Sequence, residues 1–354
     1  MTITFTSDPG AAYSPRLESD LGNSFTVAGE TDTITFEESL SEVNMVPQIT
    51  LAGGLVSITE SSAVPVLTLT TLSAFDAYVS SLGAAYSVSR RVLSPYTGPL
   101  IRVRRVADGE LANFGFTVSG ELDTAALLAW VLAGGGVQDG AVHTIYDQSG
   151  NSRDLIQATS IKQLMVVSGG LLNTVGDNEK AACRSMGAAL GPYATDAFAG
   201  YTGSKVSSCL VGTQADTGSD SERFLAVVKD ATLDYAVSTN AILSLRHTGL
   251  NMCTFRQGLG QVDIVALPAY GDFLRATRFS ETETQSILNE VATVATPSAL
   301  GAFDFNRVLV GGVSASNGNF NTGCRWAEAA VWLSDIGATK LAAIQAEQAS
   351  FFGI

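Results

Sequence analysis

The sequence of 354 residues has few charged side chains and no apolar run long enough to cross a bilayer. Charged residues make up 15%, against about 25% in an average soluble domain. Lys and Arg number 20 and Asp and Glu number 34, which gives a net charge of −14. This acid excess argues against a nucleic-acid binder, which needs a basic face. The longest apolar run, residues 125–137, is short of the roughly 20 residues that a helical span needs, so we expect no membrane insertion.

Metal-binding and disulfide patterns are also lacking. The two histidines, His143 and His247, have no partner at ligand spacing, so we expect no metal and no cofactor. No Cys-x-x-Cys motif occurs among the four widely spaced cysteines, Cys183, Cys209, Cys253 and Cys324. The first residues, MTITFTSDPG, lack the basic and apolar regions of a secretory signal. This favours buried free thiols in a chain made in the cytoplasm, although four cysteines could pair in three ways.

Residues 1–72 differ from the rest in charge and in pattern. They hold nine acidic residues and one basic residue, Arg16. Apolar residues alternate with Thr and Ser, which predicts strands with one buried face. The predicted strands are residues 2–6, 24–27, 33–36, 48–51 and 66–70. We interpret residues 1–72 as a small all-β attachment module, whose acidic face is either solvated or docks a basic partner.

From Ser73 the pattern changes. Apolar residues at steps of three and four predict an amphipathic helix over residues 73–92. Residues 99–106 predict a strand with Arg102 and Arg104 on one face, and Asp123 is placed to cap a helix over residues 124–133.

Many short strands with Gly, Asn, Asp and Ser between them follow over residues 160–333, a pattern typical of a β-sandwich or jelly roll. Residues 282–294 fit either a helix or an extended loop. Residues 325–333 predict a last strand, and Ser334 is placed to cap a final helix through Phe351. The predicted fold class is mainly β: a concanavalin-like β-sandwich over residues 73–354 with a few short helices, preceded by the all-β module.

Two segments resemble known families. The first runs over residues 78–157 and includes the string Tyr146-Asp147-Gln148-Ser149-Gly150-Asn151. It resembles the catalytic domain of arabinofuranosidase B, a module also similar to parts of phage structural proteins. The second, residues 324–354, is similar to the closing strand and helix of laminin-G-like, concanavalin-type modules. Together they imply a concanavalin-like sandwich.

The arabinofuranosidase resemblance implies a glutamate nucleophile and an aspartate acid about 5–5.5 Å apart. The family's acid follows a Gly-Gly pair, and the matching place here, Gly311-Gly312-Val313-Ser314, has no carboxylate. The family's adjacent cysteines are also missing. Glu222 is the only glutamate between Lys180 and Glu281. Because a missing acid removes a general-acid contribution of about 10²–10⁴, we expect the fold without catalysis.

Candidate ligand residues fall in two groups, each with a structural alternative. Asp147, Ser149 and Asn151 could hold a ligand or calcium ion, or could fix a tight turn with Gly150 at positive φ. Arg102 and Arg104 could bind an acidic glycan, or could cover the sheet and pair with local acids. The same basic stretch includes Arg90, Arg91 and Arg105. Trp326 and Trp332 lie six apart on a predicted strand and are expected on one face, in the core.

These observations favour a bacteriophage virion protein, such as a tail-fibre, spike or appendage subunit. Residues 1–72 would attach a homo-oligomer to other virion proteins, and the sandwich would bind host-surface glycan. An active glycosidase that trims host polysaccharide and a capsid or tail decoration protein without ligand are the alternatives.

Overall fold

The computed structural model describes the strands of residues 1–71 and most of the chain from Ser73 onward. From there the described residues are 73–136, 138–186, 193–197, 201–215, 223–228, 241–248, 251–256, 260–266, 270–279, 283–292, 296–297, 303–314, 317–318 and 323–354. The chain divides into two compact units, Met1–Val79 and Ser80–Ile354. The domain boundary that we place at 72/73 stays a prediction.

The first unit contains short antiparallel pairings. Its strands are β1 (Thr2–Thr6), β2 (Thr31–Thr35), β3 (Thr50–Leu51), β4 (Gly54–Thr59) and β5 (Thr68–Thr71). β1 pairs with β2, and β3, β4 and β5 form a three-stranded sheet. Four of the five predicted strands therefore have a counterpart, and the one at residues 24–27 lies outside the described residues.

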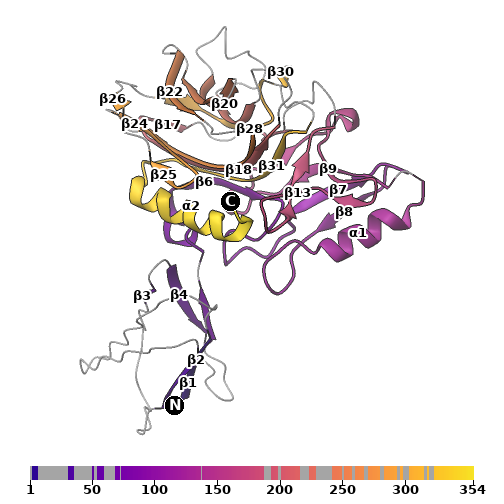
Figure 1. Cartoon of the computed structure of the whole chain (residues 1–354), viewed down its shortest axis with the longest axis horizontal. Helices are drawn as coiled ribbons and strands as arrows, with labels where there is room; N and C mark the ends of the chain where they lie inside the picture. The colour runs from indigo at the N-terminus through magenta and orange to yellow at the C-terminus, as the bar shows by residue number, and fades with distance from the viewer. Residues whose placement is uncertain are drawn as a thin grey trace. The chain divides into compact units, whose positions relative to one another are not determined.

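The second unit contains two facing antiparallel sheets, which we call sheet 1 and sheet 2 (Figure 1). Sheet 1 has the order β24–β23–β18–β31–β6. Its strands are β24 (Glu283–Leu288), β23 (Gly271–Phe279), β18 (Val206–Gln214), β31 (Arg325–Trp332) and β6 (Leu82–Ser87). The predicted mainly β sandwich is thus confirmed.

Sheet 2 has the order β22–β21–β20–β19–β28–β16–β10–β9–β7–β8. Their bounds are β22 (Gly260–Ala266), β21 (Asn251–Arg256), β20 (Ala241–Thr248), β19 (Arg223–Val228), β28 (Arg307–Val310), β16 (Tyr193–Ala194), β10 (Leu155–Ile156), β9 (Gly140–Ile145), β7 (Ile101–Arg105) and β8 (Leu111–Phe114).

Short strands and one 3₁₀ helix complete the second unit. They are β11 (Met165–Ser168), β12 (Leu171–Leu172), β13 (Thr174–Val175), β14 (Lys180–Ala181), β15 (Cys183–Arg184), β17 (Tyr201–Gly203), β25 (Val291–Ala292), β26 (Thr296–Pro297), β27 (Phe303–Phe305), β29 (Gly312–Ser314) and β30 (Asn317–Gly318), with the 3₁₀ helix η2 (Ser160–Lys162). β11 pairs with both β9 and β15, and β15 pairs with β31, so the two sheets are hydrogen-bonded through this edge.

The main core lies between the two sheets. Phe224 of β19 and Phe273 of β23 meet edge to face, with ring centroids 4.9 Å apart. Both rings are fully buried. Aromatic pairs of this kind contribute about 0.5–1.5 kcal/mol beyond the area that they bury. This pair therefore joins β19 of sheet 2 to β23 of sheet 1 across the core.

Two α-helices cover parts of this sandwich. α1 (Thr124–Ala133) begins where expected, because the side chain of Asp123 accepts a hydrogen bond from the backbone N–H of Ala126. α2 (Ala338–Phe352) lies along sheet 1 (Figure 1). Its Phe352 packs with Val211 and Leu274 on the outer face of that sheet. No helix among the described residues is long and apolar enough to cross a membrane.

The helix predicted over residues 73–92 is wrong. A short 3₁₀ helix, η1 (Asp76–Ser81), is followed directly by strand β6. Every residue of β6 is buried. Because both faces of this strand are buried, its apolar residues do not alternate, and their spacing resembles that of a helix. Within the range 282–294, the described residues 283–292 form a hairpin of β24 and β25 rather than a helix or a loop.

The expectation that Trp326 and Trp332 share a face is also wrong. Both indoles are fully buried, as expected. However, the register of β18 with β31 shifts between the pairs Gly212–Trp326 and Val211–Glu328, which leaves Ala327 as an extra residue. Such a bulge reverses the alternation beyond it. Trp326 therefore points into the main core, whereas Glu328 and Trp332 lie on the opposite face.

Candidate functional site

The turn over residues 147–151 is fixed by the carboxylate of Asp147. Its Oδ1 accepts hydrogen bonds from the backbone N–H groups of Ala85 at 3.0 Å and Ser149 at 2.9 Å. Its Oδ2 accepts from the Ser149 hydroxyl at 2.8 Å and from the N–H of Arg153 at 3.0 Å. Gly150 has a φ of 82°, as a turn of this kind requires. Because four donors already use the Asp147 oxygens, the carboxylate has little capacity left for a ligand.

Asn151 locks the same turn onto β6. Its Nδ2 donates to the backbone carbonyls of Leu82 at 2.9 Å and Gly83 at 3.1 Å, and to the hydroxyl of Ser149 at 2.9 Å. Thus the three candidates Asp147, Ser149 and Asn151 lie together, and their contacts are those of a structural lock.

A second group of polar side chains lies on the strands β7, β8 and β9. Arg102 pairs in register with Asn113 on β8 and with Thr144 on β9, so these three side chains share one face. Arg104 lies two residues further along β7 on that face. We call the group Arg102, Arg104, Asn113, His143 and Tyr146 the polar face.

His143 joins the polar face because β9 bulges at this point. The register shifts between Arg102–Thr144 and Val103–Val142, which leaves His143 unpaired. Partial burial lowers the pKa of His143, and the charges of Arg102 and Arg104 lower it further. The nearest hydrogen-bond partner of the ring is the Thr144 hydroxyl, 2.8 Å from Nδ1. Among the described residues, no carboxylate contacts this imidazole.

Tyr146 connects the polar face to Asp154. Its hydroxyl donates to Oδ1 of Asn113 at 2.9 Å. Burial raises the pKa of Tyr146, the charge of Arg102 opposes this rise, and Asp154 adds to it. Asp154 accepts a hydrogen bond from the N–H of Asp147 at 2.9 Å, and burial raises its own pKa. Asp154 is therefore the carboxyl at the edge of this face.

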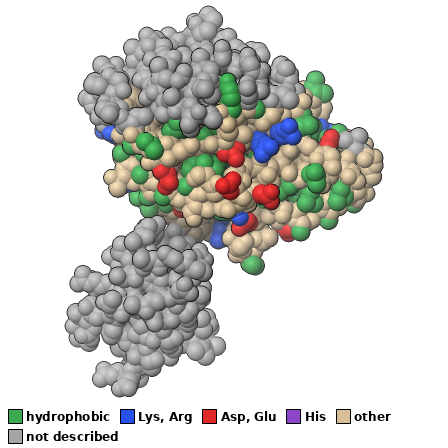
Figure 2. Space-filling view, viewed as in Figure 1, with side chains coloured by type: hydrophobic (Ala, Val, Ile, Leu, Met, Phe, Trp, Pro, Cys, Tyr) green, Lys and Arg blue, Asp and Glu red, His purple; other side chains and the backbone are tan. Residues whose placement is uncertain are grey.

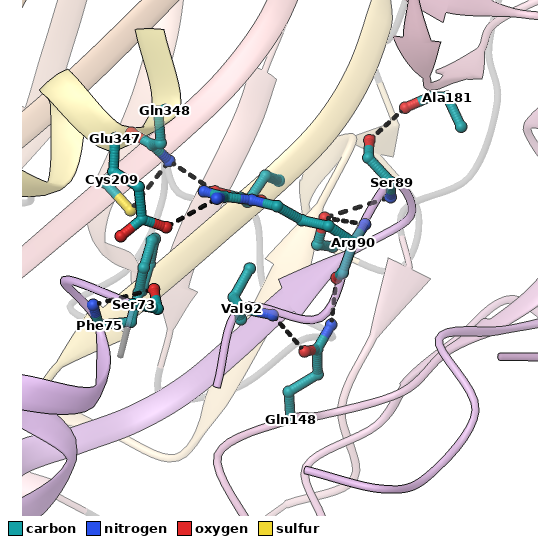
Figure 3. Close-up of polar contacts among 12 residues, drawn as sticks. Ser73, Phe75, Ser89, Arg90, Val92, Gln148, Ala181, Cys209, Glu347 and Gln348 are labelled. Atoms are coloured by element: carbon teal, nitrogen blue, oxygen red, sulfur yellow. Dashed lines mark hydrogen bonds and ion pairs between the residues drawn. The ribbon is translucent and has the colours of Figure 1, made fainter. Parts of the chain in front are cut away.

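The other arginines of the basic stretch are held by local partners. Arg90 donates from Nε and Nη2 to Glu328, both at 2.9 Å, and from Nη1 to Glu347 at 2.7 Å (Figure 3). Glu328 also accepts from Gln348 at 3.1 Å and is fully buried. Arg105 pairs with Asp108 and Glu110. Arg90 and Arg105 therefore pair with local acids, as one of the two alternatives predicts, and carboxylates neutralise both guanidinium groups.

The cysteines whose side chains are described are free and buried. They are Cys183, Cys209 and Cys324. Burial raises the pKa of the Cys183 and Cys209 thiols, which makes them unreactive at neutral pH. The side chains of Cys253 and His247 lie outside the described residues.

Three strand ends meet where the arabinofuranosidase resemblance implies catalysis. Leu225 of β19 pairs with Val310 of β28, so the start of β19 lies beside Gly311-Gly312. Arg223, the first residue of β19, pairs with Arg246 near the end of β20. Glu222, which directly precedes Arg223 in the sequence, lies outside the described residues. We call this meeting point of β19, β20 and β28 the three-strand end.

Several residues of the polar face were not recognised from the sequence. Asn113, and Gln163 beside this face, sit in segments without a motif. The strand register places Asn113 opposite Arg102, and a side-chain hydrogen bond joins Gln163, which follows η2, to Arg104. Tyr146 and Asp154 flank the Asp147–Asn151 turn. Their position beside that motif was the one feature of the sequence that could have pointed to them.

Comparisons with known proteins identify the fold. The catalytic-domain model of α-L-arabinofuranosidase B matches residues 76–235, somewhat less than half of the chain. A solved GH54 α-L-arabinofuranosidase soaked with a cyclic sulfate inhibitor aligns over 77% of this chain, with 14% identity and a TM-score of 0.58. An arabinofuranosidase complexed with arabinofuranosyl-α-1,2-xylobiose aligns over the same share, with 14% identity and a TM-score of 0.55. A search of curated proteins found no match.

The likeness to these enzymes is one of fold, given the low identity. The aligned part spans 63% of the length of each arabinofuranosidase. The expected resemblance to the arabinofuranosidase catalytic domain is confirmed. The expectation that this chain lacks catalysis is contradicted, because the model of a catalytic domain, that of arabinofuranosidase B, matches residues 76–235.

Proposed function

We propose that the chain is a glycoside hydrolase of the arabinofuranosidase type. The observation that carries the proposal is the match of the catalytic-domain model to residues 76–235, a range that contains both the polar face and the start of β19. The shared fold of the GH54 enzymes supports it over 77% of the chain. The expected substrates are α-L-arabinofuranosides and polysaccharides that carry them.

We place the reaction at the three-strand end. Retaining glycosidases need one carboxylate as nucleophile and a second carboxyl that protonates the leaving oxygen. Glu222 is our candidate nucleophile, because it precedes β19 in the sequence and the pairing of Leu225 with Val310 brings the start of β19 to the end of β28. Residues 311–314 carry no carboxylate, so the proton must come from a carboxyl of another segment.

The test is hydrolysis of 4-nitrophenyl α-L-arabinofuranoside, with reducing-sugar release from arabinan as a second assay. We expect turnover by the full chain and a loss of at least about a hundredfold in kcat for Glu222→Gln. The control is Glu179→Gln, which removes an exposed carboxylate in the turn between β13 and β14.

Each outcome decides the matter. Turnover that Glu222→Gln abolishes and Glu179→Gln leaves intact supports both the activity and the site. Turnover that survives Glu222→Gln moves the nucleophile elsewhere. No turnover on either substrate, with a folded chain shown by circular dichroism, overturns the proposed activity.

We propose further that this activity serves a bacteriophage particle. Residues 1–72 would attach the chain, as a homo-oligomer, to other virion proteins, and the sandwich would meet the glycans of the host surface. The low content of charge and the acidic first segment support an exterior role. Many weak glycan sites on one particle would bind by avidity. Mass spectrometry of purified particles, and host adsorption by particles without the chain, would test this; unimpaired adsorption would favour a decoration protein.

A further inference from the structure

The polar face is positively charged in a chain that is acidic as a whole. Four other cations of the second unit have carboxylate partners: Arg90 with Glu328 and Glu347, Arg105 with Asp108 and Glu110, Lys180 with Glu121, and Arg278 with Asp335. Arg102 and Arg104 make no ion pair with any residue that the structure describes. Their charges act together on His143, whose pKa they lower. Asp154 lies at the edge of this face, but neither arginine forms an ion pair with it, so both positive charges stay unpaired among the described residues.

The guanidinium group of Arg104 is held in place by neutral acceptors. Its Nε donates to Oε1 of Gln163 at 2.8 Å, and Nη2 lies 3.3 Å from the carbonyl oxygen of Ser160. Gln163 is only 2% exposed and is itself fixed, since its Nε2 donates to the carbonyl of Gln157 at 2.8 Å. This support orients the guanidinium and leaves Nη1 without a described partner. An oriented arginine binds a carboxylate with less loss of side-chain entropy than a mobile one.

Arg102 and Asn113 extend the same surface. Arg102 lies about 7 Å from Arg104 along β7, as two residues of a strand must. Asn113 accepts from the Tyr146 hydroxyl through Oδ1, so the two N–H groups of its amide remain donors for an incoming oxygen. The polar face thus offers two guanidinium groups, an amide and a tyrosine hydroxyl as hydrogen-bond partners for a carboxylate and neighbouring hydroxyl groups.

The opposite side of these strands is closed. Arg105 points to α1, where its Nη1 donates to the carbonyl of Trp130 at 2.8 Å. Val103 lies on that side too and belongs to the main core. Arg102 and Arg104 alternate with these residues and are partly exposed, while Ile101, Val103 and Arg105 are buried. The strand pattern therefore directs two charges outward without exposing apolar surface.

We propose that the polar face is a binding site for acidic saccharides, in which Arg102 and Arg104 hold the carboxylate of a uronic acid and Asn113 binds an adjacent hydroxyl. Charge-assisted bonds from guanidinium to carboxylate are shorter and stronger than neutral ones. The site is separate from the three-strand end, and binding here does not depend on hydrolysis.

The experiment measures binding of trigalacturonic acid to the full chain by isothermal titration calorimetry at low salt. The neutral methyl ester of the same trisaccharide is the matched ligand, because it keeps every hydroxyl and loses the charges. We expect the acid to bind, the ester to bind at least about tenfold more weakly, and Arg104→Gln to weaken acid binding by about tenfold. Lys205→Gln, which removes one exposed positive charge on another part of the chain, should leave the affinity unchanged.

Three results would overturn the proposal: no binding of the acid at millimolar concentration, equal binding of acid and ester, or equal weakening by Arg104→Gln and Lys205→Gln. The last would mean that only the net charge of the chain attracts the ligand. Arg102→Gln provides a second variant should Arg104→Gln fail to fold. Because hydrolysis is not measured, a failure here leaves the arabinofuranosidase proposal standing, and a failure of that proposal leaves this one standing.

Discussion

At the scale of single residues, Asp147 shows how one carboxylate can organise a segment. It accepts from Ala85 on β6, from Ser149 twice and from Arg153, so it ties the turn to sheet 1. We predict that Asp147→Ala lowers the free energy of unfolding by about 2–4 kcal/mol, because one buried and three partly buried donors lose their acceptor. Urea denaturation measures this. The control Asp139→Ala removes one exposed hydrogen bond to the N–H of Gly169 and should lower the free energy of unfolding clearly less. Equal losses would show that Asp147 does not organise the turn.

Asp154 gives a prediction about pH. Burial raises its pKa in the folded chain, so the folded state binds this proton more tightly than the unfolded state does. The stability that this carboxyl group contributes is therefore lost as the pH rises from the usual pKa of 3.8 towards the raised pKa in the folded chain. Asp154→Asn keeps an acceptor for the N–H of Asp147 and removes the charge. We expect a higher Tm than wild type at pH 7 and an equal Tm at pH 3; a lower Tm at pH 7 would contradict this reading.

The buried ion pair of Arg90 and Glu328 is a third test at this scale. Glu328 is fully buried between β31 and α2, and its two oxygens serve Arg90 and Gln348. We predict that Glu328→Gln lowers the free energy of unfolding by about 3 kcal/mol, since Arg90 then keeps a buried charge with Glu347 alone. Chemical denaturation measures it. The exposed control Glu179→Gln should change it by less than about 0.5 kcal/mol.

At the scale of elements, the end of α2 depends on one glycine. Gly176 has a φ of 72°, and a Cβ there would collide with the backbone carbonyl of Phe352. The next two residues of this loop donate to the helix end, Asp177 to Gly353 and Asn178 to Phe352. We predict that Gly176→Ala costs at least about 3 kcal/mol, from backbone strain and from the collision.

Gly109→Ala is the matched control for this prediction. Gly109 has a φ of 79°, but a Cβ there would meet nothing within 4 Å. Gly109→Ala should therefore lower the free energy of unfolding only by the backbone strain, about 1–2 kcal/mol. Thermal unfolding of the two variants separates the effects, and similar losses would show that the loop can move away from α2.

The elements also show what the sequence could predict. Helix α1 was predictable to the residue because Asp123 caps it through a local bond. The last helix was expected from Ser334, but α2 begins at Ala338. Gly337 has a φ of 84°, outside the helical region, and the Ser334 carbonyl accepts from Ser207 of β18 instead. Phe352 rather than Phe351 is the fully buried residue of its last turn.

Non-local pairing explains the remaining failures. Strand β6 is buried on both faces, and the bulge at Ala327 is set by the register of β18 with β31. Neither feature leaves a period in the local sequence. In the candidate sites, the basic stretch and the Asp147 string could be found by composition. The buried amide of Gln163 that orients Arg104 could not, because 59 residues separate the two along the chain.

At the scale of the whole molecule, the charge and the pattern of the sequence change together near Ser73, and the contacts divide the chain at Val79/Ser80. The sandwich is the larger unit and contains the main core between its own two sheets. The two sites that we propose, the three-strand end for hydrolysis and the polar face for binding, both belong to this unit. Residues 1–72 would then contribute attachment and no chemistry.

This division leads to the last prediction. A chain of residues 73–354 should unfold in one cooperative transition and should match the full chain in turnover and in uronic-acid binding, because every residue to which we assign a role is retained. Calorimetry and the two ligand assays test this on the same preparation. A domain of about 280 residues is large enough to bury a stable core of its own. Aggregation or non-cooperative melting of the shortened chain would show instead that the acidic β segment is part of one folding unit with the sandwich.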